Sequence, residues 1–134
     1  MGPINFNGAS DERFCESAIS VYGKKLELIA SNIANADTPH YKARDIDFQS
    51  EMARVLAKVD VKGQPTSQIP NNTVRDIFPV LYRIPSQGSA DNNTVEMDVE
   101  RAAFADTAVR YEMAVQKVAG EYKEMNDLLR SLPY

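Results

Sequence analysis

The chain has 134 residues, of which 43% are hydrophobic and 25% charged, as in one ordinary soluble domain. Its 15 basic and 19 acidic residues give a net charge of −4, so composition does not favour a nucleic-acid partner. One cysteine excludes an internal disulfide, and one histidine excludes a multi-histidine metal site. We therefore expect no metal, no cofactor and no enzyme.

No window approaches the ~18 consecutive apolar residues of a membrane span. Residues 1–8 have neither a basic patch nor an apolar run, so we expect no cleaved signal peptide. The whole chain, 1–134, is expected to form a single domain.

Residues 11–35 have the apolar spacing of an α-helix. Steps of four and three bring apolar residues onto one face of a helix. This first stripe consists of Cys15, Ile19, Tyr22, Leu26, Ile29 and Ile33. An adjoining second stripe consists of Phe14, Ala18, Val21 and Leu28. Because Pro39 disfavours helical backbone at Thr38, the helix is expected to end near Asn35.

The middle of the chain contains one further helical pattern. Residues 36–47 are expected to form a loop, and residues 48–59 a short amphipathic helix with Asp47 as its N-cap. Residues 60–97 are rich in turn-forming residues, which predicts a flexible segment, extended at most between Ile77 and Ile84.

A second long helix is predicted over residues 98–131, with Asp98 as its N-cap. Its apolar stripe consists of Phe104, Ala108, Tyr111, Val115, Val118, Tyr122, Met125 and Leu129. A helix of this length spans roughly 50 Å and does not cover its own stripe. We therefore expect a mainly α fold in which the two long helices form an antiparallel, coiled-coil-like pair.

Such a thin helical pair is marginally stable by itself and gains by stacking on other copies or partners. The two stripes are therefore candidate subunit interfaces, from Ile19 to Ile33 and from Phe104 to Leu129. Gly23 and Gly120 each cost about 1 kcal/mol inside a helix. Either they let a neighbouring helix approach closely or they are merely tolerated, and both readings stay open.

Residues that could suggest catalysis have simpler interpretations. Cys15 is expected to be a buried apolar residue, and His40 an exposed turn residue. The acidic pair Asp45 and Asp47 precedes a helix, where carboxylates cap the backbone. A catalytic function would require a turnover that is abolished when His40 or Asp45 is replaced.

One continuous motif carries a family resemblance. It runs Ser31-Asn32-Ile33-Ala34-Asn35-Ala36-Asp37-Thr38-Pro39-His40-Tyr41-Lys42-Ala43-Arg44-Asp45-Ile46-Asp47-Phe48. It resembles the signature of the bacterial flagellar basal-body rod proteins, and its end resembles the proximal rod proteins. The blocks Leu81-Tyr82-Arg83, 93–101 and 104–106 match as well. The family usually has Gly where this chain has His40.

The resemblance marks a set of signature residues, for which it implies local capping together with contact to other subunits: Asn32, Asn35, Thr38, Pro39, Tyr41, Arg44, Asp45, Asp47 and Phe48. It implies a structural subunit of the proximal rod that polymerises through its terminal helices. This rod is part of the drive shaft that transmits torque across the periplasm. The resemblance also implies export without a cleaved signal peptide.

The partners that it implies are other copies of the chain, other rod proteins, and membrane-ring and export-gate components at the rod base. Two alternatives stay open. The first is a more distal rod subunit, although distal relatives carry large inserted domains. The second is a soluble helical adaptor or export chaperone that forms a closed oligomer.

Overall fold

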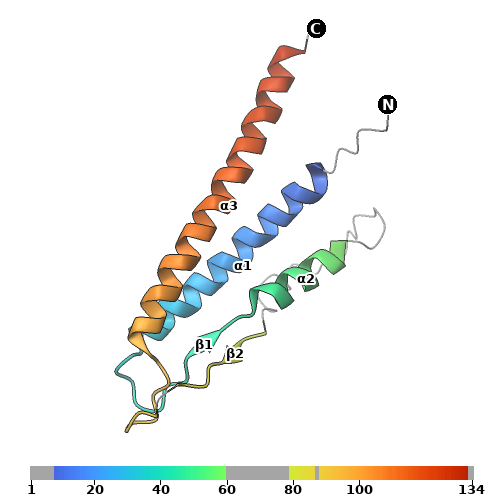
Figure 1. The fold of residues 1–134 in the computed structure, drawn as a ribbon. Helices are drawn as coiled ribbons and strands as arrows, with labels where there is room; N and C mark the ends of the chain where they lie inside the picture. The colour runs from blue at the N-terminus through green and yellow to red at the C-terminus, as the bar shows by residue number, and fades with distance from the viewer. Residues whose placement is uncertain (1–7, 60–78, 87, 133–134) are drawn as a thin grey trace.

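The computed structural model describes residues 8–59, 79–86 and 88–132. Its elements are α1 (Gly8–Ala34), β1 (Arg44–Asp45), α2 (Phe48–Val59), β2 (Leu81–Tyr82) and α3 (Met97–Ser131). The fold is mainly helical, with two long helices and a short middle one, which confirms the predicted fold class. The start of α1 and the end of α3 lie at the same end of the described structure, and the loops that join α1 to β1 and β2 to α3 lie towards the other end (Figure 1).

The helices α1 and α3 run antiparallel, side by side near the loops and diverging towards the termini (Figure 1). Their register is fixed at three levels. The Asn32 amide lies 3.2 Å from the Glu100 carboxylate, and the Tyr122 hydroxyl donates to Glu16 at 3.0 Å. Between these levels, Gly23 faces the Tyr111 ring. The predicted pairing of the two long helices is therefore confirmed.

The most deeply buried face of α1 lies between the two predicted stripes. From the first stripe only Cys15 and Ile29 are buried, and the rest are half-buried. From the second stripe Ala18, Val21 and Leu28 are buried. The physical reason is that α1 is covered on one side by α3 and on another by α2 and β1, so both stripes contribute.

The core of the molecule joins α1 to the segment that starts α2. Ala18, Val21 and Leu28 pack there with Ile46 and Met52. The Phe48 ring stacks on Tyr22 of α1, with centroids 4.3 Å apart. Ala114 of α3 and Val80, next to β2, pack against the edge of this core.

The start of α2 is capped as predicted. The Asp47 carboxylate accepts hydrogen bonds from the Gln49 amide at 3.1 Å and from the Ser50 hydroxyl. The Ser50 hydroxyl is the largest cause that holds the pKa of Asp47 below its usual value. Together these bonds satisfy a backbone donor that the first turn would otherwise leave unpaired.

The predicted cap of the last helix is wrong. Glu96 occupies the N-cap position of α3 without a side-chain capping bond, and Asp98 lies inside the first turn. The Glu96 carboxylate instead accepts a hydrogen bond from Ser86. Asp98 still lies near the positive end of the helix dipole, which favours an acidic residue there.

The two short strands pair antiparallel, with Arg44 opposite Tyr82 and Asp45 opposite Leu81. Of the middle segment that the sequence predicts to be flexible, 60–78 and residue 87 lie outside the described residues. Across the described part of the chain, no helix has the length and hydropathy that a membrane crossing requires.

Candidate functional site

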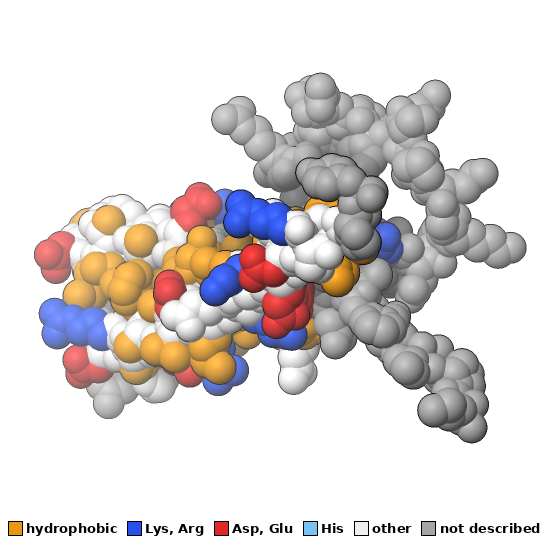
Figure 2. Space-filling view, turned by 90° about the horizontal axis from the view of Figure 1, so that it is seen from above, with side chains coloured by type: hydrophobic (Ala, Val, Ile, Leu, Met, Phe, Trp, Pro, Cys, Tyr) orange, Lys and Arg blue, Asp and Glu red, His pale blue; other side chains and the backbone are white. Residues whose placement is uncertain are grey.

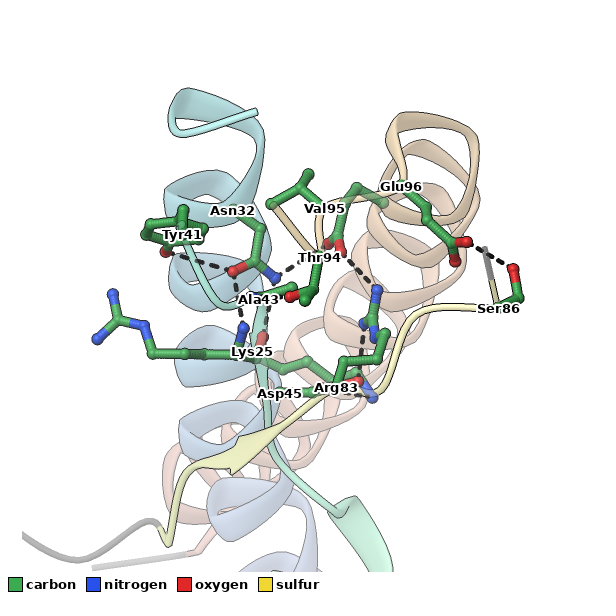
Figure 3. A network of polar contacts seen from close by, with 12 residues as sticks. Lys25, Asn32, Tyr41, Ala43, Asp45, Arg83, Ser86, Thr94, Val95 and Glu96 are labelled. Atoms are coloured by element: carbon green, nitrogen blue, oxygen red, sulfur yellow. Dashed lines mark hydrogen bonds and ion pairs between the residues drawn. The ribbon is translucent and has the colours of Figure 1, made fainter. Parts of the chain in front are cut away.

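The Asn32 side chain joins the signature loop to α1. It is fully buried, its oxygen accepts from the Arg44 amide at 2.9 Å, and its nitrogen donates to the Arg44 carbonyl at 2.8 Å. The side-chain amide thus pairs with β1 as a neighbouring strand would. The Tyr41 hydroxyl also donates to the Asn32 oxygen (Figure 3). The Glu100 carboxylate also accepts from the Asn32 nitrogen.

A chain of ion pairs extends from this amide across four segments. The Arg83 guanidinium bridges Glu100 of α3 and Asp45 of β1, with 3.0 Å to Asp45. Lys25 of α1 reaches the other oxygen of Asp45 at 3.3 Å. Figure 3 shows Arg83 between these partners, so the polar network ties the loops to both long helices.

A second group of bonds closes the end of α1. The Asn93 amide nitrogen lies within 2.8–3.0 Å of the carbonyls of Asn35, Ala36 and Thr38. These carbonyls belong to the turns after the last helical residue, where intrahelical partners are lacking. The Ser89 hydroxyl, and after it the backbone N–H of Asn93, hold the pKa of Asp91 below its usual value.

The departure from the family pattern at His40 has a structural consequence. His40 is exposed in a turn and has φ of 63°, in the left-handed region. Its amide donates to the Asp91 carbonyl at 2.9 Å, which fixes the turn against the 88–96 segment. A glycine adopts this backbone conformation without the steric penalty of a side chain.

We expect His40→Gly to raise the free energy of unfolding by about 1 kcal/mol, because it removes that steric penalty. A β-branched residue suits this region least, so His40→Val is expected to lower stability. Urea denaturation followed by circular dichroism measures both changes. A stability loss in the glycine variant would contradict this account of the turn.

The structure places the signature residues in three groups. Asn32, Tyr41, Arg44 and Asp45 lie in the network around β1. Asn35 and Thr38 bond to each other at 3.2 Å in the turn that follows α1, where Pro39 is exposed. Asp47 caps the first turn of α2, and Phe48 is its first residue. These contacts lie within the chain, and Asp45 forms ion pairs instead of capping α2.

Sequence reasoning did not select Arg83, Glu100, Asn93 and Thr94 as site residues. Arg83 and Glu100 form the centre of the network, and the Thr94 hydroxyl accepts from the Ala43 amide at 2.7 Å. All four lie in the blocks that match the family, and this match is the one feature of the sequence that could have identified them as site residues. Helical periodicity does not indicate them, because their partners lie on other elements.

The predicted stripe of α3 changes character along the helix. Ala108, Tyr111, Val115 and Val118 are half-buried, whereas Phe104 and the last part are exposed. The exposed apolar residues of this last part are Tyr122, Met125, Leu128, Leu129 and Leu132. We call these five residues the distal strip. Figure 2 shows hydrophobic side chains gathered on one face of the described part of the molecule.

A hollow of about 200 Å³ lies between α1, α3 and the start of α2, with Tyr22 and Phe48 among its lining residues. Its charged lining residues already have partners. Arg110 pairs with Asp106 at 2.9 Å, and this contact lowers the pKa of Asp106. Among the described residues, no cluster of three or more His, Cys, Asp or Glu is placed to hold a metal.

Fold and surface together have the features of a structural assembly subunit. Its two long antiparallel helices are held together at the loop end by the polar network, and the last part of α3 has an exposed apolar surface. Residues 13–42 match the family model described as flagella basal body rod protein. The chain is 41% identical to the flagellar basal body rod protein FlgB of Escherichia coli (strain K12), covering 89% of this chain and 92% of the relative. It is 39% identical to FlgB of Salmonella typhimurium, over 88% and 91% of the two chains.

A third relative, FlgB of Cereibacter sphaeroides, is 44% identical over 66% of this chain and 69% of its own. The chain therefore belongs to the flagellar basal-body proximal rod protein family. Members of this family are structural proteins, so the chain is not an enzyme. Its place is the flagellar basal body.

Proposed function

We propose that this chain polymerises through α1 and α3 into the proximal rod, and that the rod transmits torque across the periplasm. The distal strip carries the proposal. Leu128 and Leu129 remain 63% and 62% exposed on a well-formed helix. A monomer gains nothing from this exposure, whereas burying each side chain against a neighbour contributes roughly 1.5–3 kcal/mol.

The proposed contact surface consists of the residues of the first α1 stripe and of the α3 stripe that are not fully buried, together with Leu128 and Leu132 of the distal strip. On α1 it includes the half-buried Ile19, Leu26 and Ile33. On α3 it includes Phe104 and the distal strip. Contacts of this kind between unlike surfaces of identical subunits generate an open filament when the rotation from one subunit to the next does not close a ring. The proposed unit of assembly is the whole chain as a single domain.

The proposed partners are other copies of the chain, other rod proteins, and membrane-ring and export-gate components at the base of the rod. We propose a periplasmic position and export without a cleaved signal peptide. Membership of a family named for the basal-body rod supports this view.

Sedimentation of the purified chain over a wide concentration range tests the proposed function. We expect open-ended association that grows with concentration, or co-assembly with purified rod proteins. A discrete dimer at all concentrations would instead support the closed oligomer of an adaptor or export chaperone.

Substituting Gly120 by Ala distinguishes an effect on packing between subunits from an effect on helix propensity. A Cβ added at Gly120 meets nothing within 4 Å, so Gly120→Ala is expected to stabilise the monomer by about 1 kcal/mol. If a neighbouring helix approaches closely at this position, assembly weakens although the monomer gains stability. Thermal unfolding and sedimentation of the same variant measure the two effects. A less stable monomer would contradict the expected gain.

Gly23 offers the matched control within the chain. A Cβ at Gly23 would lie 3.8 Å from the Tyr111 ring, which is an ordinary contact between α1 and α3. Gly23→Ala is therefore expected to stabilise the monomer and to leave assembly unchanged. Weaker assembly in both variants would show that helix stiffness, and not close approach at Gly120, is responsible.

A further inference from the structure

Arg83 occupies an unusual position between exposed neighbours. Its guanidinium lies within the network, bridging Asp45 and the fully buried Glu100. On either side of it, Tyr82 is 68% exposed and Ile84 is 91% exposed. Apolar burial therefore does little to hold this stretch of chain in place, apart from Val80, which packs against the core.

The other polar attachments of the stretch are few, and one of them is the hydrogen bond from the exposed Ser86 to Glu96. The strand pair comprises only two residues on each side. The Arg83 amide adds one bond, to the Ala43 carbonyl at 2.9 Å. The guanidinium bond to Glu100 links residues 79–86 to the first turn of α3, and its bond to Asp45 links them to β1. Figure 3 shows Arg83 beside Asp45 and also the hydrogen bond from Ser86 to Glu96, which lies just before α3.

An ion pair of this kind contributes little net stability, because removing its charges from water offsets most of their attraction. Its geometry, in contrast, is specific, since a planar guanidinium that bridges two carboxylates admits few orientations. The network is therefore better suited to orient a segment than to stabilise the fold.

We propose that Arg83 is a positioning residue. It fixes the orientation of residues 79–86, and with it that of the exposed side chains of Leu81, Tyr82 and Ile84, against α1 and α3. Rod assembly requires this fixed orientation, and this requirement rests on the proposed function. The apolar periodicity that identifies the helices gives no indication of this role for Arg83.

Two variants separate orientation from stability. Arg83→Met alone leaves the Glu100 carboxylate buried without its cation, so the folding equilibrium constant is expected to fall roughly a hundredfold or more. The triple variant Asp45→Asn, Arg83→Met, Glu100→Gln removes the guanidinium and both of its carboxylate partners. Lys25 loses Asp45 in this variant, but 23% of its side chain is exposed, so water can hydrate its charge. The folding constant of the triple variant is expected to stay within about tenfold of the starting chain.

Hydrogen exchange then reports the orientation directly. In the triple variant we expect the Arg83 amide to exchange at least about tenfold faster, whereas the amides of α1 and α3 keep their protection. Assembly measured by sedimentation is expected to be lost at the same time. This combination is one that a purely stabilising role for Arg83 does not produce.

Three results would contradict the proposed role of Arg83. A triple variant as unstable as the single one, or one that fails to fold, would show that the network stabilises the fold and would overturn the proposal. Unchanged exchange at Arg83 would overturn it as well, as would normal assembly in a triple variant with fast exchange. If the unaltered chain does not assemble, the proposed function fails, and the exchange result still decides the role of Arg83.

Discussion

Replacing Asn32 by Asp is expected to lower the free energy of unfolding by about 3–5 kcal/mol. The Asn32 nitrogen donates to the Arg44 carbonyl at 2.8 Å and to the Glu100 carboxylate at 3.2 Å. A carboxylate in the same place has no hydrogen to donate, and it would meet the charge of Glu100 in a fully buried site.

Urea denaturation of the purified variant, followed by circular dichroism, measures this loss. Asn126 is exposed on α3, so Asn126→Asp is the matched control and is expected to change stability by less than about 0.5 kcal/mol. An Asn32→Asp variant as stable as this control would show that the side-chain amide does not hold the signature loop.

Leu129→Glu is expected to abolish assembly while leaving the monomer as stable as before. Leu129 is 62% exposed, so a charged side chain there remains hydrated in the monomer. In a polymer the same charge would be buried against a neighbouring subunit, which is strongly unfavourable without a partner. Sedimentation measures assembly, and urea denaturation measures stability.

Gln116→Glu provides the control, since it also adds a negative charge at an exposed position of α3 but lies off the apolar stripe. Because it also removes the hydrogen bond from Gln116 to Glu112, its stability is measured by urea denaturation beside its assembly. We expect this variant to assemble. Normal assembly of Leu129→Glu would remove the distal strip from the interface, and loss of assembly in both variants would indicate a general effect of charge on α3.

Helical periodicity was sufficient to predict the long elements of this fold. Alternating steps of three and four identified α1 and α3, and the short amphipathic pattern with Asp47 before it identified α2. These features depend on residues close in sequence, whose spatial relation the helix itself fixes. The pairing of α1 with α3 followed from the need to cover two apolar stripes.

Periodicity did not determine which side of α1 is most deeply buried. Ile19 and Leu26 belong to the predicted stripe yet are half-buried, whereas Val21 and Leu28 of the neighbouring stripe are buried. The burial depends on where α2 and α3 both touch α1, and sequence spacing within one helix does not contain that information.

The network around Arg83 was likewise beyond a pattern-based prediction. Its contacts join Arg83 to Asp45 and Glu100, which lie 38 and 17 residues away along the chain. A lone arginine in a turn-rich segment has no periodic partner, and the family blocks contained it without indicating its contacts. The turn at His40 was different, because the family usually has Gly at this position, and Gly is the residue that most readily adopts the positive φ found there.

Imaging of basal bodies that contain this chain, at a resolution that shows side chains, tests the central claim most directly. The account predicts polar, head-to-tail stacking in which Tyr122, Met125 and Leu129 are buried against neighbouring subunits. Subunits that leave these three side chains facing solvent, or that meet only as closed two-fold pairs, would contradict it.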